Sequence, residues 1–182
     1  SRDGLFGPET AAAVNKYKKD KGLEAINEAG IIAPLALPSG FKGNFGQQRK
    51  THVHNGIDIS ASVGTPIKAI ADGVVVMSNP NYNDTCGAGI SIKHADDFQS
   101  GYCHLSKNSV NVGDSVKQGD VIGLTGGAVG AAGAGNSQGP HLHFTLKKGG
   151  TPVNPMSYFG GSIGAFSAPT DSFLTGGSVI TV

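Results

Sequence analysis

Histidine and aspartate residues at short, regular spacings are the part of this sequence most able to do chemistry. His54-Asn-Gly-Ile-Asp58 places an imidazole and a carboxylate four residues apart, and His141-Leu-His143 places two imidazoles two residues apart. A further histidine, His104, lies between these two motifs. Zinc binds imidazole nitrogen and carboxylate oxygen, and a catalytic zinc site has three protein ligands and an exchangeable water. The pattern predicts a hydrolytic zinc centre built from the first motif and one histidine of the second.

Two of these histidines would then lie near the metal without coordinating it. Zinc lowers the pKa of its bound water towards 7, a nearby imidazole can take the proton, and an imidazolium can stabilise an oxyanion. His52 and His94 fall outside the motifs and are expected to be surface or core residues. Tyr102 and Cys103 precede His104. We interpret the first as a buried aromatic rather than a group that aids the transition state, and the second as a core or disulfide cysteine rather than a nucleophile.

Composition narrows the possible classes of protein. The chain has 182 residues, of which 29 are glycine, and its formal net charge is +1. No dense block of lysine and arginine is present, which argues against a nucleic-acid partner. No apolar run approaches the ~20 residues that span a bilayer, so no membrane insertion is expected. Few charges and abundant glycine, serine, asparagine and threonine favour short strands joined by turns, which predicts a mainly β protein.

Short β-branched segments bounded by turn residues predict the strands. They are 57–59, 67–70, 73–77, 89–93, 121–124 and 141–146. Such spacing without a helical stretch between strands predicts a small antiparallel sheet or sandwich. Alternation along the last strand places both of its histidines on one side of the sheet. The Gly-rich segment 126–139 is expected to form a wall of the site that moves over substrate.

The chain divides into four predicted regions. Residues 1–30 carry helical spacing and form a short N-terminal appendage, and residues 31–44 are a Pro-punctuated linker. Residues 45–158 form the main domain, and residues 159–182 are a Gly/Ser-rich tail that is either flexible or a docking strand. The only cysteines, at positions 86 and 103, form either one disulfide or two free buried thiols. A disulfide would favour a location outside the cell.

The motifs between Phe45 and Phe144 resemble, in order, the catalytic domain of the lysostaphin-type zinc metallopeptidases, which cut the peptide part of bacterial peptidoglycan. The matching segments are Phe45-Gly-Gln-Gln-Arg49, His54-Asn-Gly-Ile-Asp-Ile59, Gly64-Thr-Pro-Ile67, Ala71-Asp-Gly73, Tyr102-Cys-His-Leu105, Val112-Gly-Asp-Ser-Val116, Gly119-Asp-Val-Ile-Gly123 and Gly139-Pro-His-Leu-His-Phe144. The resemblance implies that one zinc ion is bound by His54, Asp58 and His143. It also implies that His104 and His141 are catalytic and face the zinc-bound water and the substrate carbonyl.

The function implied by the resemblance is a zinc-dependent endopeptidase that hydrolyses peptide bonds in peptidoglycan cross-links or stem peptides. Its partners would be peptidoglycan peptides, and its location would be extracellular, periplasmic or on a phage virion. One alternative is a non-catalytic cell-wall-binding or virion-structural protein of the same fold, which the complete set of ligand residues disfavours. Another is a general metallopeptidase that acts on Gly-rich proteins.

Two further features qualify the resemblance. The segment Asp3-Gly-Leu-Phe-Gly-Pro-Glu-Thr10 is similar to the second half of a helical peptidoglycan-binding module. Together with the C-terminal tail, it could join the domain to a larger assembly or parent polypeptide. Only four residues separate Arg49 from His54, which is shorter than the family commonly shows. We expect that rim of the groove to be trimmed.

Overall fold

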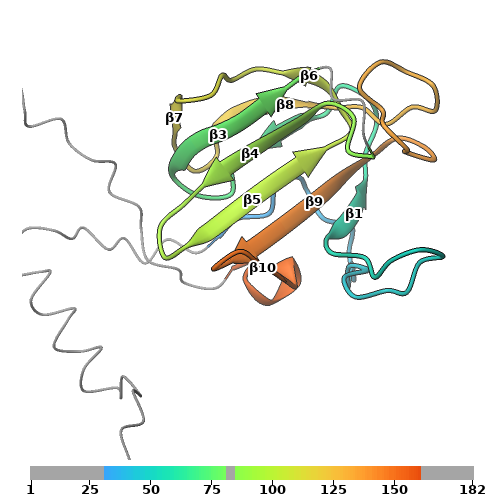
Figure 1. The fold of residues 1–182 in the computed structure, drawn as a ribbon, viewed down its shortest axis with the longest axis horizontal. Coiled ribbons are helices and arrows are strands. Elements are labelled where there is room, and N and C mark those ends of the chain that lie inside the picture. The colour runs from blue at the N-terminus through green and yellow to red at the C-terminus, as the bar shows by residue number, and fades with distance from the viewer. Residues whose placement is uncertain (1–30, 81–84, 161–182) are drawn as a thin grey trace, which may run out of the picture.

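The structure is a computed structural model, and it describes residues 31–80 and 85–160. These residues are mainly β (Figure 1). The predicted N-terminal helical appendage and almost all of the predicted tail lie outside the described residues. Among the described residues, none of the helical structure is long and apolar enough to cross a membrane.

Two antiparallel sheets make up the described fold. The larger sheet has the strand order β1-β9-β5-β4-β3-β7, with β10 also paired to β9, and the smaller one has the order β2-β8-β6. Figure 1 shows the strands of the larger sheet side by side, with β1 at one edge. The strands are β1 (Ile57–Ser60), β2 (Pro66–Lys68), β3 (Gly73–Asn79), β4 (Gly89–Lys93), β5 (Phe98–Cys103), β6 (Leu105–Asn108), β7 (Ser115–Val116), β8 (Val121–Thr125), β9 (His141–Lys148) and β10 (Thr151–Val153), and one 3-10 turn, η1, covers Pro155–Ser157.

Side-chain alternation along β9 separates the core from the open face of the larger sheet. Leu142, Phe144 and Leu146 are fully buried, whereas His141 and His143 between them are only partly buried. The buried residues of β9 belong to one hydrophobic cluster that also includes residues of the smaller sheet. This cluster fixes the orientation of β9, because slipping the strand by one residue would turn its apolar side chains towards solvent.

The six predicted strands are confirmed as β1, β2, β3, β4, β8 and β9, and the mainly antiparallel β fold is confirmed with them. Strands β5, β6, β7 and β10 were not predicted. In β5, the alternating buried positions are Phe98, Ser100 and Tyr102. A serine in the middle of this face interrupts the apolar pattern. Its hydroxyl is satisfied in the core by the Nε2 atom of His94 at 2.7 Å.

The segment predicted as a linker lies against the sheets at its start. Ile31 is fully buried and forms a parallel bridge with Phe159. The carbonyl of Pro34 accepts a hydrogen bond of 2.9 Å from the backbone of Lys68 in β2. These contacts add the first part of residues 31–44 to the packed structure.

The two cysteines form a disulfide, which confirms the first of the two alternatives for them. Cys86 lies before β4 and Cys103 ends β5, and their Cα atoms are 4.9 Å apart. The disulfide therefore joins two neighbouring strands of the larger sheet at one end.

Candidate active site

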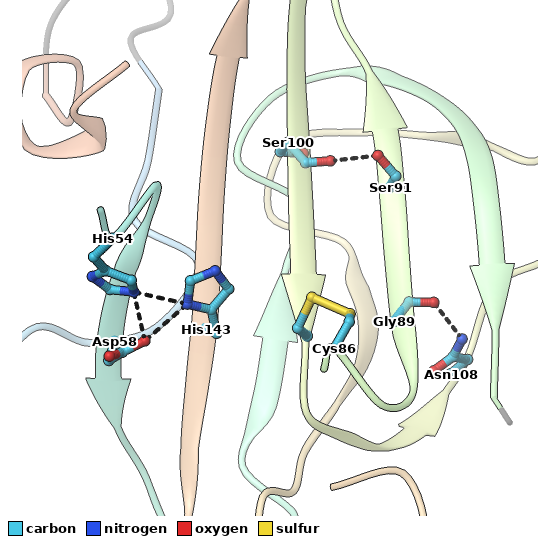
Figure 2. Close-up of a disulfide and its surroundings, with 9 residues drawn as sticks. His54, Asp58, Cys86, Gly89, Ser91, Ser100, Asn108 and His143 are labelled. Carbon is cyan, nitrogen blue, oxygen red and sulfur yellow. Dashed lines mark hydrogen bonds and ion pairs between the residues drawn. A yellow bond between two sulfur atoms is a disulfide. The ribbon is translucent and has the colours of Figure 1, made fainter. Parts of the chain in front are cut away.

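The register of β1 against β9 brings together Asp58 and His143, two of the three predicted metal ligands. Asp58 lies directly opposite His143 in this antiparallel pair. Facing residues of such a pair point to the same side of the sheet. The Nδ1 atom of His143 lies 2.9 Å from Oδ1 of Asp58. Figure 2 shows the two side chains pointing towards each other across the two strands.

His54 completes the group from the turn before β1. Its Nε2 atom lies 3.1 Å from Nδ1 of His143 and 3.2 Å from Oδ1 of Asp58. The Nδ1 atom of His54 lies 2.9 Å from the carbonyl of Asn44. A carbonyl can only accept, so Nδ1 carries the proton and the Nε2 lone pair faces the other two side chains. We call His54, Asp58 and His143 the donor cluster.

Glycine at position 56 is required by the close packing of the turn before β1 on β9. A Cβ atom at Gly56 would collide with the carbonyl oxygen of Phe144, and it would lie 3.0 Å from the His143 ring. The glycine in the middle of the His54-Asn-Gly-Ile-Asp58 motif is therefore required for a steric reason. Only glycine lets this turn approach the strand that carries His143.

The donor cluster fits a single divalent metal ion. Its three potential ligand atoms come from two imidazoles and one carboxylate, and the distances between them are 2.9, 3.1 and 3.2 Å. A tetrahedral zinc ion with bonds of about 2.0–2.1 Å holds its ligand atoms roughly 3.3–3.4 Å apart. Without a metal, a proton on His143 donates to Asp58, and metal binding would displace that proton.

Asn44 and Arg49 hold the second carboxylate oxygen of Asp58. The Arg49 guanidinium lies 2.8 Å from Oδ2, and the Asn44 side-chain amide donates to the same oxygen at 3.1 Å. The backbone of Asp58 donates in turn to the Asn44 side chain at 2.9 Å. Oδ1 is thereby left facing the donor cluster. Sequence reasoning gave neither residue a role, although Arg49 lies in one of the matched motifs.

The short connection between Arg49 and His54 is a tight turn. The backbone of Arg49 donates to the carbonyl of His52 at 2.9 Å, and Gln48 bridges to Val53. This turn folds the chain back on itself and brings the guanidinium within reach of Asp58. The short connection from Arg49 to His54, which predicts a trimmed rim of the groove, therefore also places Arg49 beside the donor cluster.

Electrostatics keep the donor cluster ready for a cation. Burial alone would raise the pKa of Asp58, but the hydrogen bond from His143 and the charges of the neighbouring histidines hold it well below its usual value. Burial lowers the pKa of His54, against the opposing effects of the Asn44 carbonyl and Asp58. An ionised carboxylate and a neutral imidazole are the forms that bind a metal.

His141, the first residue of β9, lies at the open side of the donor cluster. Its Nε2 atom is 3.7 Å from Oδ1 of Asp58. Its Nδ1–H donates to the carbonyl of Gly139 at 2.8 Å and to the Ser137 hydroxyl oxygen at 3.1 Å. These contacts fix the tautomer with the Nε2 lone pair directed to the cluster. The role of Ser137 was not predicted, because a serine in a Gly-rich loop has no distinctive sequence pattern.

His104 is positioned by irregular backbone between β5 and β6. Its φ of 65° is in the left-handed region, so the extended conformation of β5 does not continue through this residue. Its ring centroid is 4.7 Å from that of His141 and 6.0 Å from that of His143. Burial, followed by the nearby histidines, lowers the pKa of His104 to about 4. We call His104 and His141 the histidine pair.

The Nδ1 atom of His104 is buried and has no hydrogen-bond partner of good geometry. The Ala134 backbone lies near this ring and opposes the lowering of its pKa, but it does not meet that geometry with Nδ1. Only one of the two nitrogens of a neutral imidazole carries a proton.

The remaining predicted residues lie away from the site. His52 is exposed, and His94 is buried with hydrogen bonds to the Asp72 carbonyl at 2.9 Å and to Ser100. Tyr102 is fully buried, and its hydroxyl lies 3.1 Å from that of Ser100. The interpretations of these three residues as surface or core residues are confirmed.

The sequence is similar to a known protein family and to proteins of named activity. The family described as Peptidase family M23 matches residues 52–155. A peptidoglycan DD-endopeptidase of Vibrio cholerae, ShyA, is 41% identical over 144 residues, which cover 75% of this chain and 31% of ShyA. The glycyl-glycine endopeptidase ALE-1 of Staphylococcus capitis is 40% identical over 144 residues, which cover 79% of this chain and 33% of that protein.

A solved structure extends the comparison to the fold. A variant of the catalytic domain of EnpA, a prophage-encoded M23 protein of Enterococcus faecalis, superposes with a TM-score of 0.57 at 34% sequence identity. The match covers 70% of this chain and 97% of that one. By contrast, the chain spans only about a third of the length of ShyA and of ALE-1.

Proposed function

The chain belongs to peptidase family M23, a family of metallopeptidases, and from this membership we propose that it is a zinc-dependent endopeptidase. Its substrates are the peptide bonds of bacterial peptidoglycan, in cross-links or stem peptides. The relatives named as a peptidoglycan DD-endopeptidase and a glycyl-glycine endopeptidase support this substrate class. The observation that carries the proposal is the donor cluster, whose three potential ligand atoms lie 2.9, 3.1 and 3.2 Å from one another, close to the ligand-to-ligand spacing of a tetrahedral zinc site.

One zinc ion per chain is the proposed metal, held by His54, Asp58 and His143. Two imidazoles and one carboxylate are a ligand set of the kind found in catalytic zinc sites, in which a water takes a further position. When bound, zinc supplies a Lewis acid that polarises the scissile carbonyl and lowers the pKa of water. Arg49 and Asn44 orient Asp58 for this task through its other oxygen.

His141 is the proposed general base. Its Nδ1–H is engaged by the Gly139 carbonyl, so its Nε2 lone pair is available to take the proton of the attacking water. His141 then passes this proton to the leaving amine nitrogen, which completes cleavage of the peptide bond.

His104 is proposed to donate a hydrogen bond to the oxyanion that forms on the substrate carbonyl. A pKa of about 4 keeps its ring neutral near pH 7. It therefore acts as a neutral N–H donor rather than as a cation, and a fixed donor of this kind contributes several kcal/mol to oxyanion stabilisation.

An extracellular or periplasmic location is consistent with peptidoglycan as the substrate of the named relatives. The Cys86–Cys103 disulfide is typical of proteins in oxidising compartments. Association with a phage virion, or with a larger assembly through residues 1–30 and 159–182, is an extension of this proposal.

The test is digestion of purified sacculi containing either direct D-Ala-to-diaminopimelate links or glycine bridges. Mass spectrometry of the muropeptides identifies any bond that is cut. We expect His104→Ala and His141→Ala to keep one zinc per chain, by elemental analysis, yet to lose turnover by about 10²- to 10⁴-fold. The exposed His52→Ala is the matched control and should retain full turnover.

Two results would contradict the proposal. Binding to sacculi without release of new amines would support the non-catalytic alternative. Loss of zinc from either histidine variant would show that the assigned roles of the donor cluster and the histidine pair are wrong.

A further inference from the structure

The disulfide lies beside the site as well as between two strands. Cys103 is the last residue of β5, directly opposite His143 of the donor cluster, and it is followed by His104. On its other side Cys103 pairs with Gly89 of β4. Figure 2 shows the Cys86 disulfide at the end of the strand next to the one that carries His143. One half of the disulfide, Cys103, is therefore the residue that immediately precedes His104.

The backbone around His104 is held from the Cys86 side. A φ of 65° is uncommon for a residue other than glycine, and it persists only where the surroundings impose it. The His104 backbone donates to the Cys86 carbonyl at 2.9 Å, and that of Leu105 donates to the Ala88 carbonyl at 3.1 Å. Segment 86–88 therefore fixes the conformation of His104 by two hydrogen bonds, and the disulfide fastens this segment to the neighbouring Cys103.

The same segment anchors the Gly-rich loop 126–139. The Ala88 backbone donates to the Gly133 carbonyl at 2.8 Å. A Cβ atom at Gly87 would collide with Gly133 and Gly135, so the two backbones are packed without room for a side chain. Near its middle the loop is thus attached to segment 86–88.

This loop contacts both members of the histidine pair. The Ser137 hydroxyl oxygen accepts from Nδ1–H of His141, and the Ala134 backbone lies near the ring of His104. Ser137 also donates to the Gly127 carbonyl at 2.8 Å. Contacts that begin at the disulfide therefore end at both histidines, whereas the donor cluster is fixed by the pairing of β1 with β9.

We propose that the Cys86–Cys103 disulfide is a positioning element for the reaction: by fastening segment 86–88 it holds His104, and through the Gly-rich loop His141, in place beside the donor cluster. The inference rests on the proposed function, because it concerns the two histidines assigned to proton transfer and oxyanion stabilisation. Without the disulfide, His104 can relax towards the more common negative-φ conformations, and its ring then leaves the substrate carbonyl. Metal binding does not depend on this link.

The first test is kinetic and uses the full chain with zinc bound. We expect Cys86→Ser/Cys103→Ser to keep one zinc per chain and to lose about tenfold to hundredfold in kcat, with KM changed less than about twofold. Reduction of the wild-type protein with a water-soluble phosphine should have the same effect. The phosphine is oxidised to its oxide with oxygen from water, and the two sulfurs become thiols. The double variant should not respond to the phosphine.

A matched control separates positioning from stability. Val116 is buried in β7, at the edge of the larger sheet farthest from β1. Val116→Ala should lower the melting temperature without lowering kcat below the melting range. A kcat that survives removal of the disulfide, or that falls equally in Val116→Ala, would overturn the proposal.

The second test does not depend on turnover. NMR of protein labelled in its histidine side chains, in the zinc-free form, reports each imidazole separately. We expect reduction to shift or broaden the signals of His104 and His141 and to leave the buried His94 unchanged. Unchanged His104 signals would overturn the proposal, and so would a collapse of all histidine signals, since the disulfide would then stabilise the whole fold. A wild-type protein that cuts no peptidoglycan bond would contradict the proposed function alone, because the NMR result would still decide the positioning role.

Discussion

The donor cluster and the histidine pair are built in different ways, although they lie side by side. In the donor cluster, Asp58 and His143 are facing residues of two paired strands, and their backbones are part of the larger sheet. In the histidine pair, His104 has a left-handed φ between two strands, and His141 depends on a serine of a Gly-rich loop. Regular β pairing therefore sets Asp58 and His143, whereas irregular backbone sets His104 and a loop orients the ring of His141.

The difference shows which part of the site should tolerate change. A shift in strand register would expose the buried face of β9, so the donor cluster is protected by the same burial that stabilises the fold. His104 has no such protection and relies on the hydrogen bonds of its backbone to segment 86–88 and on one disulfide, whereas His141 shares β9 with His143 and depends on the loop for the orientation of its ring. We therefore expect changes near the pair to affect turnover while leaving the metal in place, and changes in the cluster to remove both.

The largest expected effect is that of Asp58→Ala. This change removes the carboxylate ligand and leaves Arg49 without its ion-pair partner. We expect loss of bound zinc by elemental analysis and a fall in turnover of more than about a thousandfold, because several kcal/mol of charge stabilisation are lost. Asp114→Ala, in an exposed turn, is the control and should retain both. A variant of Asp58 that keeps stoichiometric zinc would contradict the difference between the donor cluster and the histidine pair.

A smaller effect is expected for Ser137→Ala, which tests the histidine pair rather than the donor cluster. The change removes the hydroxyl contact to Nδ1 of His141 but keeps the Gly139 carbonyl as its acceptor. We expect kcat to fall about threefold to tenfold, with zinc content unchanged. Steady-state kinetics with a soluble peptidoglycan peptide measure the effect, and Ser157→Ala, at an exposed position of η1, is the control. Loss of zinc from Ser137→Ala would mean that the donor cluster and the histidine pair are not separable.

Much of the regular pairing in the site could be predicted from the sequence. Alternation along His141–Leu146 predicted which residues of β9 share a face. Spacing alone left open which histidine of the second motif belongs with Asp58, and the resemblance to a family favoured His143. In the structure, Asp58 pairs with this residue.

The irregular backbone of the site could not be predicted in the same way. The left-handed backbone of His104 is held by hydrogen bonds that His104 and Leu105 donate to the distant segment 86–88. The role of Asn44 depends on a turn that folds it back onto Asp58. Neither relation leaves a local pattern, since each depends on which distant backbone groups become neighbours.

The smallest expected effect concerns His94, a histidine that belongs to neither the donor cluster nor the histidine pair. Burial lowers its pKa, and the Asp72 carbonyl and charge oppose this shift only in part. The unfolded chain gains a proton at His94 as the pH falls below about 6.5, while the folded chain does not, so the stability contribution is present above that pH and is lost below it. His54 and His104 act in the same direction, but their contributions are common to the wild type and a His94 variant.

His94→Gln isolates this contribution, because glutamine can replace both hydrogen bonds of the imidazole and does not titrate. Each unit by which folding lowers the pKa of His94 corresponds to about 1.4 kcal/mol. Urea unfolding from pH 8 to pH 5 should show that the wild type loses its advantage over the variant as the pH falls, while kcat at pH 7 is unchanged. A constant gap between the wild type and His94→Gln would contradict the lowered pKa of His94. A fall in its kcat would connect this core histidine to the site and remove the separation between fold and chemistry on which the comparison rests.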